Sequence, residues 1–260
     1  MTRKSEFWSV HFTNKMMLLT NYRERPQIKF PCIVQEKLDG VRCLVRNGKA
    51  YSRSGREIKN IQSILDELGQ LDVQLDGELW AENLTLAQIT GMLNRKGQTR
   101  DLKMYVFDIK APLPFSERIK ILEKVQNEYT FSNVRFVKNY CCETEEEALA
   151  LADSFIARGG EGAVFRNLNG LYINARSKCV QKYKSRFDEE FKVTGYSYTD
   201  TCLKLLKCVT ACGSTFYVRC PADLTHTDLT NKMVTIRYLL KDPLTDIPRE
   251  AVCTGVRCTF

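Results

Sequence analysis

The spacing of apolar segments changes near Phe187, and this change restricts the possible folds more than any other feature of the sequence. Before it, short apolar runs alternate with amphipathic stretches, which predicts strands alternating with helices. After it, five strand-like runs and one short helix-like stretch follow at close spacing, which is typical of a small all-β unit. We therefore expect an α+β chain with two domains, residues 1–187 and residues 188–260, joined by a short linker near 185–190.

Turn and cap signals locate individual elements. Asn47-Gly48 lies between two apolar runs and predicts a hairpin. Asn60 is predicted to cap a helix, Ser116 to open another, and Thr144 with Glu147 to form a capping box. Further strands are predicted at 73–80, 103–109, 162–166 and 179–184, and a helix at 84–94. In the second domain, strands at 191–198, 203–210, 215–219, 233–239 and 251–256 and a helix at 221–229 would build a small closed β-barrel such as an OB-fold.

Positive charge is concentrated in the first domain. The chain of 260 residues has 39 Lys and Arg against 31 Asp and Glu, a net charge of +8. Residues 188–260 contain nine of each, so the whole excess belongs to residues 1–187. This imbalance favours a polyanionic partner, although a basic surface that only aids solubility would look the same.

Neither a membrane span nor an export signal is expected. No apolar stretch approaches the ~18 residues that cross a bilayer, and polar side chains interrupt residues 5–15, where a signal peptide would be apolar. The 11 cysteines show no metal-ligand spacing such as C-x-x-C, so we do not expect a structural zinc ion. They are typical of reduced thiols in an intracellular, cytoplasmic protein.

The segment 35–42 (QEKLDGVR) is the sharpest candidate for chemistry. It places Lys37 at the end of a strand, followed by a tight turn in which Gly40 permits close packing. Lys37 is then positioned to attack an electrophile, and Arg42 can bind phosphate oxygens. Because a surface hairpin with a solvated lysine could have the same short pattern, the segment needs support from the rest of the chain.

Five further motifs follow in order: 51–55 (YSRSG), 75–80 (LDGELW), 104–108 (MYVFD), 161–166 (EGAVFR) and 180–184 (VQKYK). Together with the closing 255–257 (GVR), this series resembles the covalent nucleotidyltransferases. It is most similar to the smallest ATP-dependent DNA ligases, of the virus-like and bacterial accessory type, over residues 28–257. The resemblance implies a nucleotidyltransferase (adenylation) domain with an ATP-grasp-like ligase fold of antiparallel sheets and helices, followed by an OB-fold domain.

The resemblance also implies a role for each matching residue. Lys37 would attack the α-phosphorus of ATP and become lysyl-AMP. Phe107 would stack on adenine, and Glu78 would bind the ribose and, with Glu161, a Mg²⁺ or Mn²⁺ ion. The remaining implied contacts are the adenine edge for Gln35 and Glu36, ribose or phosphate and the 5′-phosphate of the nick for Arg42 and Arg53, and phosphate for Arg176, Lys182 and Lys184.

The implied activity is sealing of nicks in duplex DNA by a monomer that uses ATP and releases AMP and diphosphate. An RNA ligase or an mRNA-capping guanylyltransferase is the alternative, and a non-catalytic nucleic-acid-binding protein is a remote one. Taken alone, Phe107 could be a core residue, and Lys182 and Lys184 a solvated strand face. Compared with larger ligases, we expect no helical DNA-binding domain and no DNA-encircling hairpin in the second domain, and Asp246 lies where a glycine is common.

Overall fold

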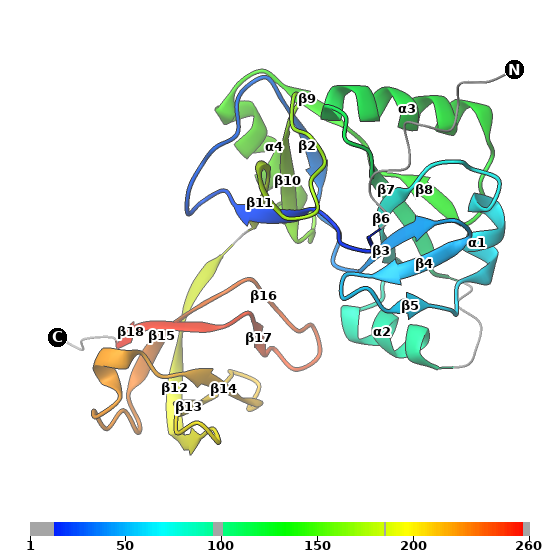
Figure 1. Ribbon diagram of the computed structural model, residues 1–260. Coiled ribbons are helices and arrows are strands. Elements are labelled where there is room, and N and C mark those ends of the chain that lie inside the picture. Colours follow the sequence, from blue (N-terminus) through cyan, green and yellow to red (C-terminus); the bar gives the residue numbers. More distant parts are fainter. Residues whose placement is uncertain (1–12, 96–100, 185, 257–260) are drawn as a thin grey trace, which may run out of the picture. The chain divides into compact units, whose positions relative to one another are not determined.

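The computed structural model describes residues 13–95, 101–184 and 186–256. The chain divides between Tyr183 and Lys184 into two compact units (Figure 1). Arg257, the last residue of the closing motif 255–257, lies outside the described residues. Within the described ranges, no helix is both long and apolar enough to cross a membrane.

The first unit contains two sheets. One has six strands in the order β5-β4-β3-β6-β7-β8, antiparallel except for the parallel pair β7 and β8. The other has five strands in the order β1-β11-β10-β2-β9, with β1 and β11 parallel. The strands of the six-stranded sheet are β3 (Val41–Arg46), β4 (Lys49–Ser52), β5 (Glu57–Ile58), β6 (Leu75–Trp80), β7 (Lys103–Ile109) and β8 (Val134–Phe136). Those of the five-stranded sheet are β1 (Leu18–Asn21), β2 (Cys32–Glu36), β9 (Tyr140–Cys142), β10 (Gly162–Asn167) and β11 (Arg176–Lys184).

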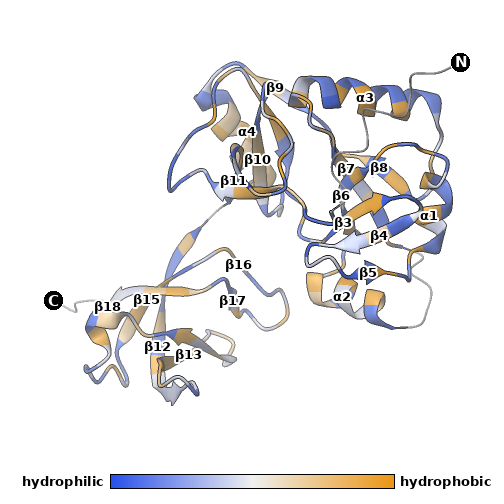
Figure 2. Ribbon diagram, in the orientation of Figure 1, coloured by the Kyte–Doolittle hydropathy of each residue, from blue (hydrophilic) through white to orange (hydrophobic). Residues whose placement is uncertain are grey.

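Each sheet has its own apolar core, covered by helices. The helices are α1 (Gln62–Leu68), α2 (Leu86–Asn94), α3 (Phe115–Glu128) and α4 (Glu145–Ala157). Ile64 of α1 and Ile89 of α2 pack into the core of the six-stranded sheet, and Phe155 of α4 packs into that of the five-stranded sheet. In Figure 2, α3 alternates between hydrophilic and hydrophobic colours along its turns, as expected for a helix with one buried face.

One irregularity in the pairing of β6 with β7 changes the direction of a side chain on β7. Val106 pairs with Gly77 and Asp108 pairs with Asp76, so Phe107 is an extra residue on β7. Such a β-bulge re-aims the side chains around it. Met104 and Val106 point into the apolar core, whereas Phe107 belongs to none of the apolar clusters found among the described residues.

The second unit is built on one antiparallel five-stranded sheet in the order β14-β13-β12-β15-β18. Its edge strands β14 and β18 approach within 8 Å, Cα to Cα, but no hydrogen-bonded ladder joins them among the described residues. The elements are β12 (Phe187–Tyr198), β13 (Lys204–Val209), β14 (Thr215–Arg219), the 3₁₀ turn η1 (Ala222–Leu224), β15 (Met233–Tyr238) and β18 (Val252–Val256), with a small hairpin of β16 (Leu240–Lys241) and β17 (Pro248–Arg249).

The structure corrects three predicted caps. Asn60 does not cap α1, because its amide donates to the carbonyls of Leu93 (2.9 Å) and Arg95 at the end of α2. Helix α3 begins one residue before Ser116, since Pro114 is its N-cap. The capping box of α4 forms only in part: Thr144 accepts from the backbone N–H of Glu147, but the Glu147 carboxylate accepts from Glu143 instead.

Two further predictions are wrong. The predicted helix at 221–229 is reduced to η1, because the N–H of Leu229 donates to the hydroxyl of Tyr196 and not to the carbonyl of Thr225 four residues before it. The carbonyls of Thr225 and Thr227 instead accept from the ammonium group of the buried Lys204, at 3.0 and 2.9 Å. The predicted linker at 185–190 is mostly strand, since β12 begins at Phe187. Its first residue, Ser185, lies outside the described residues.

Candidate active site

A pocket lies between the two sheets of the first unit, and most of the predicted nucleotide-binding residues line it. Six of them, from β2, the turn after it, β3, β6 and β7, meet here: Gln35, Glu36, Lys37, Arg42, Glu78 and Phe107. The other lining residues were not predicted: Leu19, Leu38, Val137, Val164 and Arg166. The pocket therefore combines an apolar wall with a lysine, two carboxylates and two arginines.

Lys37 forms an ion pair with Glu161. Its backbone N–H donates to the carbonyl of Gly162 at 3.0 Å, which extends the pairing of β2 with β10 by one residue. The Lys37 side chain is 22% exposed, and that of Glu161 only 4%. The end of β2 thus presents the amine at the pocket, and a buried carboxylate from a distant segment holds it there.

Glu78 lies opposite Arg42 in the pairing of β6 with β3. Burial raises the pKa of its carboxyl group from 4.5 to about 7. The cations Arg42 and Lys37 offset part of this rise, and the carboxylates of Asp76 and Glu161 add to it. Glu78 therefore changes protonation near neutral pH.

Phe107 is half-buried, and its ring lines the pocket. The guanidinium carbons of Arg42 and Arg166 lie 4.6 and 5.4 Å from the ring centroid. Cations this close to an aromatic ring are attracted to it and restrain it. The ring is thus a pocket wall, which supports the stacking interpretation over the core interpretation.

Arg42 is tied to a fully buried carboxylate. It forms two hydrogen bonds with Asp76, each of 2.6 Å, and a third with the carbonyl of Met17 at 3.3 Å. The hydroxyl of Tyr172 also donates to Asp76, at 2.6 Å. Burial alone would lower the pKa of Arg42, but Asp76 outweighs it and raises that pKa above its usual value. Arg42 therefore stays charged and is held rigidly.

A second buried network lies behind Phe107. Asp108 accepts hydrogen bonds from Arg118 of α3 (2.6 and 3.1 Å) and from Arg166 of β10 (2.7 Å). Arg166 also donates to Gln35 at 2.7 Å. Burial lowers the pKa of Arg166, and the Asp108 carboxylate opposes that change. Arg166 was not predicted from the sequence, because its place at the end of the motif 161–166 does not indicate which residues it pairs with.

Four predicted nucleotide-binding residues do not line this pocket. Arg53 is exposed in the turn between β4 and β5, and Arg176 donates to the carbonyl of Leu19. Lys182 is partly buried on β11 at the position that pairs with Asn21. Lys184 lies at the start of the second unit, where its ammonium group is 2.9 Å from a carboxylate oxygen of Glu250.

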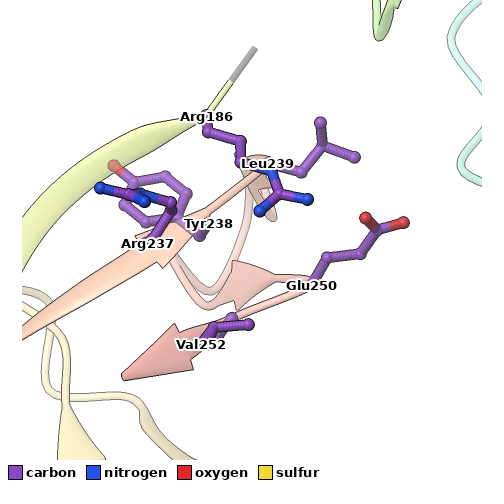
Figure 3. A pocket seen from close by; sticks show the side chains of 7 residues that line it. Arg186, Arg237, Tyr238, Leu239, Glu250 and Val252 are labelled. Carbon is purple, nitrogen blue, oxygen red and sulfur yellow. The ribbon is translucent and has the colours of Figure 1, made fainter. Parts of the chain in front are cut away.

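A separate pocket occurs in the second unit (Figure 3). Figure 3 shows Arg237 and Tyr238 on one side and Glu250 on the other, with Arg186 between them. Arg237 forms two hydrogen bonds of 2.7 Å with Asp188. This pocket contains none of the predicted nucleotide-binding residues.

Comparison with known proteins shows the family of the chain. The family model of the ATP dependent DNA ligase domain matches residues 23–184. This chain belongs to the ATP-dependent DNA ligase family. A DNA ligase of African swine fever virus (isolate Tick/South Africa/Pretoriuskop Pr4/1996) is 31% identical over 86% of this chain and 63% of its own length. The DNA ligase of Enterobacteria phage T4 is 24% identical over 69% of this chain and 50% of its own length.

Solved structures show the same fold. A Lig E DNA ligase structure covers 94% of this chain and 100% of its own, with a TM-score of 0.84 and 18% identity. Chlorella virus DNA ligase-adenylate covers 96% of this chain and 100% of its own, with a TM-score of 0.60 and 22% identity. The resemblance drawn from the motifs is confirmed, and the ligase has the nucleotidyltransferase-domain fold. It spans 63% of the length of the African swine fever virus relative.

Proposed function

We propose that this ligase seals nicks in duplex DNA with ATP, through an adenylate on Lys37. The observation that carries this proposal is the position of Lys37, held by Glu161 in a pocket walled by Phe107 and Glu78. The Lys37 nitrogen forms a bond to the α-phosphorus of ATP as the bond to diphosphate breaks. The AMP group then passes to the 5′-phosphate of the nick, and the 3′-hydroxyl displaces AMP to form the phosphodiester.

The pocket residues suit an adenosine monophosphate. Phe107 offers a ring for adenine to stack on, beside Gln35 and Glu36, and Glu78 lies where a ribose hydroxyl can bind. Arg42 contributes positive charge for phosphate oxygens. For Arg53, Arg176, Lys182 and Lys184 we propose contacts with phosphate groups of ATP or the nick, which would act once nucleotide or DNA is bound.

Glu78 and Glu161 fit a divalent cation such as Mg²⁺ or Mn²⁺. Glu161 contributes to the raised pKa of Glu78, so the two carboxylates repel each other and would be stabilised by a cation. Mg²⁺ typically takes one or two carboxylates, phosphate oxygens and waters, so this small donor set is sufficient. A bound ion would supply positive charge beside the phosphoryl oxygens. Glu161 pairs with the Lys37 ammonium group and would hold such an ion together with Glu78, and the Lys37 nitrogen must give up its proton before it attacks.

We propose that the second unit is an OB-fold. Its sheet runs third, second, first, fourth and fifth strand in chain order, from β14 to β18. Pairing of β14 with β18 would close this sheet into a five-stranded barrel of the OB type, and these two strands already approach each other. On this proposal residues 1–187 are the adenylation domain and residues 188–260 the OB-fold domain.

One face of the second unit fits a DNA backbone. Side chains of β12, β13 and β14 alternate between the apolar core and an outward face, on which Lys192, Lys207 and Arg219 are the cations. Asp188 and Glu190 lie on the same side of β12, in the part of the strand that pairs with β15. None of the three forms an ion pair with a described residue, and the part of this face where β12 pairs with β13, and β13 with β14, contains no acid. We call it the cation face; its members are Lys192, Gly195, Ser197, Leu205, Lys207, Val209, Thr215, Tyr217 and Arg219. We propose that it contacts phosphates of the duplex.

The test is a sealing assay on a nicked duplex with ATP, NAD or neither, together with labelling by radioactive ATP or GTP. We expect sealing and labelling with ATP but not with NAD or GTP, and we expect the label to map to Lys37. Lys37→Ala should abolish both, whereas Lys59→Ala, which removes an exposed lysine of the same unit, should leave both unchanged. Labelling by GTP, or joining of RNA ends alone, would instead favour a capping enzyme or an RNA ligase.

A further inference from the structure

We propose that Arg166 is a positioning residue that makes the pocket select adenine over guanine, by fixing the orientation of the Gln35 amide. This inference rests on the proposed function, because it requires a nucleotide base to bind beside Gln35. Arg166 and Gln35 both line the pocket, and the Arg166 N–H donates to the Gln35 side-chain oxygen at 2.7 Å.

The chemistry of its neighbours determines which way the Gln35 amide points. A guanidinium has only donors, so the amide oxygen must face Arg166. The backbone carbonyl of Phe107 is only an acceptor, and the Gln35 nitrogen donates to it at 3.1 Å. The same nitrogen donates to the side-chain oxygen of Asn139 at 2.7 Å. Rotating the amide by half a turn would place oxygen against oxygen and nitrogen against guanidinium.

This orientation leaves Gln35 able to offer the pocket only an acceptor. Both of its amide hydrogens are used, and one of the two lone pairs of its oxygen is taken by Arg166. The 6-amino group of adenine is a donor and matches the remaining lone pair. The 6-oxo group of guanine is an acceptor, so guanine would leave two oxygens facing each other in a buried site.

Arg166 is itself held firmly enough to impose this choice. It is 4% exposed, pairs with Asp108 at 2.7 Å, and lies 4.7 Å from the centroid of Phe115 and 5.4 Å from that of Phe107. Asp108 is shared with Arg118, which does not contact Gln35. Without Arg166, only the acceptors Phe107 and Asn139 would hold the Gln35 amide, so turning an N–H group toward the base would cost less.

The test measures kcat/KM for adduct formation on Lys37 with ATP, with GTP and with purine riboside triphosphate, which lacks the 6-amino group. We expect Arg166→Met to reduce the preference for ATP over GTP, and over the analogue, by about tenfold, the effect of removing one hydrogen bond in a buried site. Arg166→Lys, which keeps a donor, should retain part of the preference. Arg118→Met is the matched control: it removes the other arginine of Asp108 and should lower ATP and GTP use equally.

Two outcomes would overturn the inference. One is a folded Arg166→Met enzyme with the wild-type preference; the other is an equal loss of preference in Arg118→Met. If Arg166→Met does not fold, Gln35→Met decides, because it removes the acceptor itself: loss of the preference supports the inference, and full preference refutes it. Failure of the proposed function is separate, since the wild-type enzyme would then form no adenylate on Lys37.

Discussion

Glu78 couples the pocket to pH through its burial. Its folded pKa of about 7 exceeds the ordinary 4.5, so the folded chain binds this proton more tightly than the unfolded chain. The contribution of Glu78 to stability must therefore fall as pH rises from about 4.5 to about 7, and the whole of this loss is present above pH 7. Glu78→Gln removes this loss and should raise the free energy of unfolding at pH 8, by on the order of 2 kcal/mol, but hardly at pH 4.5.

Urea unfolding of wild type and Glu78→Gln at pH 4.5, 6, 7 and 8 checks this expectation. The difference between the two proteins should grow with pH and level off above pH 7. A difference that is the same at every pH would show that burial does not raise the pKa of Glu78. The same substitution should slow adenylation at every pH, because it removes a carboxylate from the proposed ribose and metal site.

Phe107 should matter for nucleotide binding more than for stability. Its ring lines the pocket and lies outside the apolar clusters. Phe107→Ala should therefore raise the KM for ATP in adduct formation by about tenfold, because adenine no longer has a ring to stack on. Its cost to stability should stay below the ~3–5 kcal/mol of a core substitution. Phe155→Ala, in the core under α4, is the control and should show that full cost. If both variants were equally destabilised and the KM for ATP were unchanged, Phe107 would act as a core residue.

At the scale of elements, local signals in the sequence predicted those features that depend on neighbours along the chain. The Asn47-Gly48 turn and the strands beside it were correct. The cap at Asn60 failed because its amide donates to the carbonyl of Leu93 at the end of α2, 33 residues away in the chain. Short strands such as β8 and β9 were missed, because three residues carry too little periodicity to be recognised.

The pocket shows the same division. Lys37, Glu78 and Phe107 could be predicted because each lies in a motif with a recognisable order along the chain. Arg166 could not, since its role depends on Asp108 and Gln35 meeting it from two other strands. Spacing along the chain says little about which charges pair across two sheets, so buried networks of this kind need the structure.

The turn after β2 depends on a glycine for close packing. A Cβ at Gly40 would lie 2.3 Å from the carbonyl oxygen of Leu79 and 2.9 Å from a side-chain carbon of Glu78. Gly40→Ala should therefore push the turn away from β6, lower stability by a few kcal/mol (about 1–3) and reduce ATP labelling. Gly91 of α2 is the matched control, because nothing lies within 4 Å of its Cβ position.

Thermal unfolding and ATP labelling of both variants check this prediction. Gly91→Ala should stabilise the protein by up to ~1 kcal/mol, since alanine favours a helix interior, and should leave labelling unchanged. If Gly40→Ala behaved like Gly91→Ala, the close approach of the turn to β6 would have no energetic consequence.

At the scale of the whole molecule, charge is distributed unevenly between and within the two parts of the chain. Residues 188–260 are neutral overall, with nine basic and nine acidic side chains. Several of the acids are paired: Asp188 with Arg237, and Glu189 with Lys241. The cation face has no acid, so a neutral unit can still present a positive surface to a nucleic acid.

The cation face should therefore determine part of the salt dependence of DNA binding. Substituting Lys192, Lys207 and Arg219 by Ala should weaken binding to a nicked duplex and reduce the slope of log K against log salt by about 0.9 for each phosphate that the variant no longer neutralises. Labelling of Lys37 by ATP without DNA should not change.

Arg237→Ala is the control, because it also removes a cation from this unit but one already paired with Asp188. Filter binding or fluorescence anisotropy from 50 to about 200 mM salt measures the slopes. If the triple variant kept the wild-type slope, another surface would have to bind the duplex. If Arg237→Ala changed the slope as much for each cation removed as the triple variant did, net charge rather than this face would govern binding.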